Sequence, residues 1–110
     1  MPKIADYTIA GASGTKYTFG IYPRETSWKD VGAVYILTKR TIKQDGGGSH
    51  THVYVGQTQN MNDRHMNHHK VECFDSYNAN CIGVFLESSE EKQLEIEADI
   101  LASGSWPCNG

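Results

Sequence analysis

The segment from position 52 to 68 constrains the fold most, because it describes a strand that turns directly into a helix. Residues 53–55, Val-Tyr-Val, form a β-branched and aromatic run that is typical of a strand. Gly56 ends this run, and Asn60 is a favourable helix N-cap. Four residues share one face of the expected helix at about 100° per residue, namely Met61, Arg64, His65 and His68. The segment can therefore bring a tyrosine, an arginine and a histidine to one place.

This arrangement resembles the core of the GIY-YIG nuclease family, whose second signature, Tyr-Ile-Gly, corresponds here to Tyr54, Val55 and Gly56. In that family an arginine follows the tyrosine by ten residues, and in some members a histidine follows the arginine by four. Arg64 and His68 meet both spacings. The alternative interpretation is a strand, a turn and a surface helix whose arginine has no special role.

Two segments can supply the family's first signature, Gly-Ile-Tyr. Residues 20–22 spell it letter for letter, but Pro23 follows at once and is expected to interrupt a central strand. Residues 33–35, Ala-Val-Tyr, begin a β-branched run and are the better candidate, which makes Tyr35 the first tyrosine of the site. Residues 44–49, which contain three glycines, predict a flexible hairpin loop between the two signature strands.

The remaining segments predict the other elements of a small domain. Runs at 7–10 and 16–19 flank a Gly/Ser turn and predict an N-terminal hairpin. Residues 81–86 predict a third strand, and a helix is expected from Ser88 or Ser89 to about Ala102.

The resemblance implies an α/β fold, with a small central three-stranded antiparallel sheet flanked by helices and an N-terminal hairpin extension. The expected division is an extension over residues 1–31, packed on a nuclease-like domain over residues 32–110.

The last predicted helix carries a carboxylate on its apolar side. The expected apolar arc at about 100° per residue consists of Leu94, Ala98, Ile100 and Leu101. Glu97 falls inside this arc, and a carboxylate that faces a core needs a partner because burying a bare charge is costly. A metal ion or a cation can be that partner, and a structural salt bridge with Arg64 is the alternative. The resemblance implies the metal, because the family's metal-binding glutamate lies on this helix, followed by a Pro-x-Asn-like segment such as 107–109.

The resemblance further implies an enzyme, a metal-dependent endonuclease that hydrolyses phosphodiester bonds of DNA. The implied catalytic residues are Tyr35, Tyr54, Arg64, His68 and Asn109. Glu97 would bind a single Mg²⁺ or Mn²⁺, because Mg²⁺ accepts one carboxylate and keeps much of its water. The nucleic acid is expected to contact Lys39, Arg40, Lys43 and Gly56. Either tyrosine can act as the base, and an ordinary tyrosine pKa of ~10 leaves that choice open.

Composition bounds the remaining possibilities. The 110 residues form one domain. No apolar run approaches the ~18 residues of a membrane helix, and no secretory signal is visible, so a cytoplasmic protein without a membrane partner is expected. The three cysteines lack metal-site spacing and are expected to be reduced thiols. The net charge of −3 means that DNA affinity would need a local basic patch, a metal or a partner protein.

Two other functions fit parts of the pattern. His50 and His52, together with His65 and His68, can form a zinc-binding module. Alternatively, the chain is a catalytically silent domain that keeps the fold and binds nucleic acid or protein. The presence of all four tyrosine, arginine and glutamate candidates argues against the silent domain, whereas the acidic charge argues for it.

Overall fold

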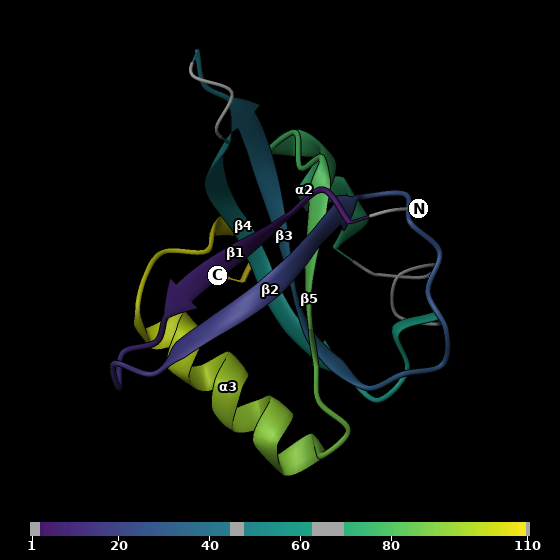
Figure 1. Ribbon diagram of the computed structural model, residues 1–110, viewed down its shortest axis with the longest axis vertical. Coiled ribbons are helices and arrows are strands. Elements are labelled where there is room, and N and C mark those ends of the chain that lie inside the picture. Colours follow the sequence, from purple (N-terminus) through teal and green to yellow (C-terminus); the bar gives the residue numbers. More distant parts are fainter. Residues whose placement is uncertain (1–2, 45–47, 63–69, 110) are drawn as a thin grey trace.

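A single antiparallel sheet dominates the structure, a computed structural model that describes residues 3–44, 48–62 and 70–109. Its strands are β1 (Ala5–Ala10), β2 (Lys16–Pro23), β3 (Ala33–Ile42), β4 (Gly48–Thr58) and β5 (Cys81–Leu86). The described part also contains two short helices, α2 (Val71–Ser76) and α3 (Glu90–Ala102), and the 3₁₀ turn η1 (Pro107–Asn109). The strand order is β1-β2-β5-β3-β4. The sheet curls into an open half-barrel, so that β1 and β2 cross in front of β3 and β4 (Figure 1).

The expected three-stranded sheet flanked by helices is therefore wrong. The three predicted strands are present as the neighbours β4, β3 and β5, but β2 continues the same sheet by pairing with β5. The N-terminal hairpin, which the sequence predicts correctly as β1 and β2, belongs to the sheet and is not packed on it. Among the described residues, only the α3 helix covers a large part of one face, so the fold is mostly sheet.

The expectation about Pro23 is also wrong. Residues 20–22 lie in β2, where they pair with residues 82–84 of β5, and residues 20 and 21 pair with β1 as well. Pro23 is the last residue of the strand and pairs with Cys81. A proline at the end of a strand removes no hydrogen bond from the middle of a ladder, which is why the sheet tolerates it.

The two faces of the sheet bury separate clusters of side chains. Alternation along β3 places Ala33, Tyr35 and Leu37 on one side, which we call the tyrosine face, where Met61 and Phe74 cover them. Val34 and Ile36 point to the other side, the α3 face, where α3 and Trp106 cover them. All six residues from Ala33 to Thr38 are buried. Each fully buried aliphatic side chain contributes about 1.5–3 kcal/mol, so β3 is the centre of the core.

A β-bulge in β4 changes which face its residues occupy. The β3–β4 register shifts between Leu37 and Thr38, because Leu37 pairs with Tyr54 whereas Thr38 pairs with His52. Val53 is thus the extra residue of a bulge. Consequently Tyr54 packs on the tyrosine face, while His52 stacks on Trp106 at the α3 face.

The β1–β2 hairpin is fastened to the end of α3. Gly14 occupies the turn with φ +89, a conformation that a glycine adopts without strain. Asp99 of α3 accepts hydrogen bonds from the Ser13 backbone N–H at 2.8 Å and from the Ser13 and Tyr17 hydroxyls at 2.7 Å each. These hydrogen bonds, those from Ser13 foremost, hold the pKa of Asp99 below its usual range. No helix in the described segments is long and apolar enough to span a membrane.

Candidate active site

The two tyrosines predicted for the site do lie together. Tyr35 stands opposite Gly56 in the β3–β4 ladder, and the rings of Tyr35 and Tyr54 are 6.0 Å apart between centroids, inclined by 38°. Gly56 permits this approach. A Cβ added there would lie 2.7 Å from the Tyr35 hydroxyl oxygen and 2.7 Å from Tyr54 Cε2. The sequence assigned Gly56 to nucleic-acid contact, whereas its position shows that it makes room for the two rings.

A short helix covers Tyr54. Phe74 of α2 packs on it with ring centroids 5.2 Å apart. The Arg24 guanidinium lies 5.7 Å from the Phe74 ring centroid, and Arg24 pairs with Asp75 at 2.8 Å. The tyrosines are consequently enclosed, with 2% of Tyr35 and 8% of Tyr54 exposed. The sequence analysis missed Phe74, because the polar segment from 70 to 80 has no periodicity that marks a helix.

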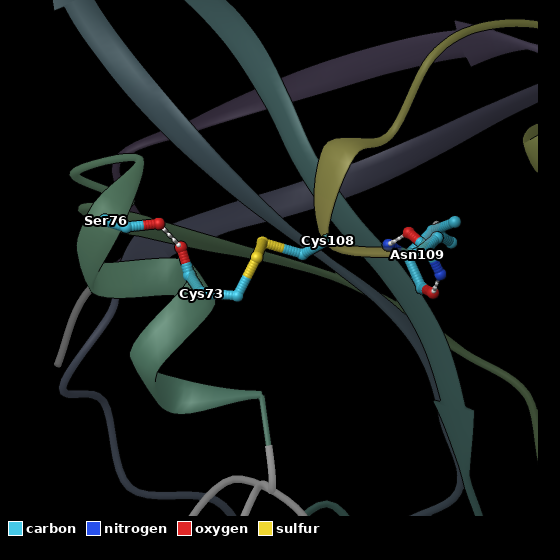
Figure 2. Close-up of a disulfide and its surroundings, with 5 residues drawn as sticks. Cys73, Ser76, Cys108 and Asn109 are labelled. Carbon is cyan, nitrogen blue, oxygen red and sulfur yellow. Dashed lines mark hydrogen bonds between the residues drawn. A yellow bond between two sulfur atoms is a disulfide. The ribbon is translucent and has the colours of Figure 1, made fainter.

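Asn109 fixes the strand that carries Tyr54. Its side-chain Oδ1 accepts a hydrogen bond from the Val55 backbone N–H at 2.9 Å, and its Nδ2 donates to the Val55 carbonyl oxygen at 2.8 Å (Figure 2). Because β4 is an edge strand, the outward backbone groups of Val55 have no neighbouring strand to pair with. Asn109 replaces that strand at the residue between Tyr54 and Gly56, which makes it a positioning residue in this structure.

A disulfide joins the helix α2 to the 3₁₀ turn η1. Cys73 in α2 and Cys108 in η1 are bonded, with a sequence separation of 35 (Figure 2). The expectation of reduced thiols is therefore wrong for these two residues, and only Cys81 is a free, buried thiol. The bond holds Phe74, which covers Tyr54, and Asn109, which fixes β4, in one connected unit. Cysteine spacing alone gave no sign of this pairing.

Glu97 lies on α3 and is half-buried. The expected apolar arc of this helix is wrong, because Leu94 is 47% exposed and Ala98 is exposed, whereas Gln93, Ile96 and Ile100 are buried. Burial of Gln93 follows from tertiary contact, since its Nε2 donates to the Glu87 carbonyl oxygen. Glu97 borders the true buried side. The α3 helix packs on the α3 face, mainly against β4.

The donor set suits an ion that needs few protein ligands. Across the described part of the chain, no group of three or more His, Cys, Asp or Glu side chains is placed to hold a metal. That excludes from the same residues the four-ligand geometry of structural zinc. A single half-buried carboxylate fits Mg²⁺ or Mn²⁺ with water and substrate oxygens as the other ligands. Glu97 is the residue that would hold such an ion.

The three expected basic contacts do not share a face. Lys39 follows Leu37 by two residues and is exposed on the tyrosine side of β3. Arg40 points to the opposite side, where its guanidinium passes over Gly48. Lys43 is exposed just beyond the end of β3. Of the three, Lys39 and Lys43 are therefore the ones available to a substrate at the tyrosines.

Two predicted residues, Arg64 and His68, lie outside the described residues. The segment that leads to them begins as expected. Asn60 Oδ1 accepts from the Asn62 backbone N–H at 3.1 Å, and Met61 is buried on the tyrosine face. The chain thus enters this segment beside Tyr35 and Tyr54.

The two histidines of the zinc alternative occupy the α3 face. His52 Nε2 is 2.8 Å from the Tyr7 hydroxyl, and its ring stacks on Trp106 at 4.2 Å. His50 Nδ1 is 2.9 Å from Thr38 Oγ1. His65 lies outside the described residues, as His68 does. The contacts of His50 and His52 are to aromatic and hydroxyl groups, so their observed role is structural.

Comparison of the chain with protein-family models, with curated proteins and with solved structures gave no match.

Proposed function

We propose that this protein is a metal-dependent endonuclease that hydrolyses phosphodiester bonds of DNA. The observation that supports this proposal is the convergence of Tyr35 and Tyr54 over Gly56, from strand positions 19 residues apart. A chain that needed only a packed core would gain more from aliphatic residues here, because two buried phenols each require a hydrogen-bond partner. The resemblance to GIY-YIG nucleases supplies the reaction that two such tyrosines serve.

Each residue of the site has a specific task in this reaction. Tyr35 and Tyr54 orient the attacking water, and one of them, as its phenolate, accepts the proton of that water. Arg64 donates hydrogen bonds to the phosphoryl oxygens as negative charge develops on them, and His68 hydrogen-bonds a tyrosine or a phosphate oxygen. Glu97 would hold the ion, which when bound polarises the phosphate and stabilises the leaving oxygen.

The rest of the chain keeps these groups in position. Asn109 holds the β4 backbone at Val55, and the disulfide holds η1 against α2. Both restrict Tyr54 to one orientation, and a reacting group that is displaced by about 1 Å can lose on the order of 10²-fold in rate.

Hydroxyl deletion tests the proposal with a matched control. Tyr35→Phe and Tyr54→Phe should each lower cleavage of a supercoiled plasmid in Mg²⁺ by about 10²-fold or more. Tyr77→Phe removes the same atom from a residue that is 47% exposed and should leave cleavage unchanged. Wild-type activity that persists in a chelator, or in the Tyr35→Phe/Tyr54→Phe double variant, would contradict the proposal.

A second experiment separates the two roles of Glu97. As a metal ligand, Glu97→Gln should abolish both cleavage and the stabilisation of the protein by Mg²⁺, because an amide is a weak Mg²⁺ ligand. As a structural partner of Arg64, it should instead lower the metal-free melting temperature and leave cleavage intact. Arg64→Ala should reduce cleavage by about 10²–10³-fold, the usual loss for one transition-state donor.

The silent interaction domain is the second candidate, favoured by the enclosure of the tyrosines, of which 2% and 8% are exposed. It predicts DNA binding without turnover in any divalent metal. Saturable binding of a labelled duplex by a protein that shows no cleavage in Mg²⁺ or Mn²⁺ would favour this candidate over the nuclease.

A further inference from the structure

A polar cluster lies where the first strand meets the fourth, on the α3 face and away from the candidate active site. Tyr7 of β1 reaches across the curled sheet, its ring 4.4 Å from that of His50 and its hydroxyl 2.8 Å from His52 Nε2. Arg40 stands opposite His50 in the β3–β4 ladder. The four side chains, which we call the histidine cluster, are Tyr7, Arg40, His50 and His52. All four are half-buried, so each keeps part of its surface in contact with solvent.

Arg40 is held in place through its backbone and through the packing of its guanidinium. Asn80 makes two hydrogen bonds with its backbone, at 2.7 Å and 3.1 Å, and the guanidinium lies over Gly48, where an added Cβ would be 2.8 Å from Nε. Arg40 Nε is buried and has no hydrogen-bond acceptor. Within residues 3–44, 48–62 and 70–109, no carboxylate forms an ion pair with it. A buried donor without an acceptor is destabilising, and an arriving acceptor can satisfy Nε once the Arg40 side chain shifts to expose it.

The histidines add further donors and no negative charge. His50 Nδ1 is occupied by Thr38, and its Nε2 makes no hydrogen bond within the described part of the chain. If Thr38 donates to Nδ1, the neutral ring keeps its hydrogen on Nε2. Burial lowers the pKa of both histidines, and the charges of Arg40 and His52 lower that of His50 further. Trp106 Nε1, beside His52, is a second buried donor without an acceptor.

The described charged groups that act on this neighbourhood are the Arg40 guanidinium and the exposed Glu25 carboxylate. Burial raises the pKa of the nearby Cys81 thiol, while Arg40 lowers it and Glu25 raises it. Burial also raises the pKa of Tyr7, so its hydroxyl stays protonated. Glu25 is exposed, and it is the one carboxylate whose influence on this neighbourhood is evident among the described residues. A site with donors, a fixed guanidinium and no paired carboxylate is suited to an oxyanion.

We propose that the histidine cluster binds a phosphate group, with Arg40 and His50 as the donors and the Tyr7 ring as one wall. A guanidinium is planar and presents several N–H groups, which match the oxygens of a tetrahedral oxyanion. The group belongs either to a free phosphate or mononucleotide or to a nucleic-acid backbone. The site is on the face of the sheet opposite the tyrosines, so the test of phosphate binding does not depend on nuclease activity.

Sulfate is the first probe, because it keeps its charge between pH 5.5 and 8 and has the tetrahedral shape of phosphate. Sulfate should shift the imidazole NMR signals of His50 saturably and raise its pKa, since an adjacent anion stabilises the imidazolium. Binding should be tighter at pH 5.5 than at pH 8 for the same reason. A linear, unsaturated response, or an unchanged His50 pKa, would overturn the proposal without recourse to any variant.

A pair of neighbouring substitutions isolates the site from general charge effects. Arg40→Gln should weaken sulfate binding about tenfold or more, the usual loss for a hydrogen bond to a charged group. Lys39→Gln removes the same charge from the adjacent residue on the opposite face and should leave the affinity unchanged. Equal losses in both variants would mean charge screening and would refute the site. If Arg40→Gln does not fold, Arg40→Lys keeps the charge but lacks the Nε donor, and should still weaken binding.

Two further ligands distinguish the sources of the phosphate. Competition of a mononucleotide with sulfate at similar or higher affinity identifies a small-molecule site. Competition by a short single-stranded oligonucleotide alone identifies contact with a nucleic-acid backbone, and this binding should weaken steeply with salt. Both ligands are added in a chelator, so that cleavage at the tyrosines plays no part in the result. Failure of both ligands and of inorganic phosphate to displace sulfate would refute a phosphate site.

Discussion

Breaking the Cys73–Cys108 bond should lower stability by an amount that the closed loop determines. For a sequence separation of 35 between the two cysteines, the chain-entropy relation gives about 4 kcal/mol lost when the bond no longer restricts the unfolded chain. Unfolding entropy is ~2.1 cal/mol/K per residue, which for a chain of 110 residues converts this loss into a melting temperature lower by about 15 °C. Phe74 and Asn109 remain as contacts, so the fold itself should survive at room temperature.

Thermal melting of three samples measures this effect. The oxidised protein, the protein in excess dithiothreitol and a Cys73→Ser/Cys108→Ser variant are compared, and the last two should agree. The variant must melt identically with and without dithiothreitol, since buried Cys81 is then the only thiol that remains. A second readout is hydrogen exchange at the Val55 amide, which should accelerate when η1 is released from α2. A decrease of less than about 3 °C would refute the reasoning, because the unfolded chain would then already keep the two cysteines close.

Three further predictions address individual contacts. Gly56→Ala should cost about 1–3 kcal/mol in urea unfolding because a tyrosine must move, whereas Gly104→Ala, with open space around it, should be nearly neutral. Asn109→Ala should cost a similar ~1–3 kcal/mol, because it leaves the β4 backbone unpaired at a half-buried edge. Because burial lowers the folded-state pKa of His50 and His52, their contribution to stability is complete above the unfolded pKa of ~6.5 and is lost as the pH falls below it. The urea midpoint should therefore decrease from pH 7.5 to pH 5, and His50→Gln/His52→Gln should flatten that decrease, which a constant wild-type midpoint would contradict.

Local sequence signals identified most elements but not how they assemble. The strands around Tyr35, Tyr54 and Ile82 have β-branched and aromatic runs, and Ser89 caps α3 as expected by accepting a hydrogen bond from Lys92 N. The predicted sheet is too small because a proline is expected to interrupt a strand, whereas Pro23 is the last residue of β2 and interrupts nothing. Whether a hairpin extends a sheet or packs on it depends on long-range pairing, which no local pattern encodes.

The candidate site was predicted in part for similar reasons. The pairing of Tyr35 with Gly56 follows from strand register, and spacing along two strands was enough to place the tyrosines together. The predicted buried side of α3 differs from the observed one by a rotation of about 100° around the helix axis, which is one residue step. The difference arises because Gln93 is buried and donates a hydrogen bond to Glu87, which hydropathy does not anticipate. The packing of α2 on Tyr54 and the disulfide both depend on contacts between distant segments, so no periodic pattern in the sequence predicts them.

The single inserted residue at Val53 divides β4 into two halves whose side chains alternate out of step with each other. Before the bulge, the even-numbered residue His52 lies on the α3 face, and after it the even-numbered residue Tyr54 lies on the tyrosine face. In a systematic substitution scan along β4, tolerated and damaging positions should therefore alternate, and this alternation should shift by one residue at Val53. Deleting Val53 would restore a regular alternation and move the side chains of one half of the strand to the opposite faces of the sheet. A substitution in one half should accordingly leave unchanged the faces that the side chains of the other half occupy.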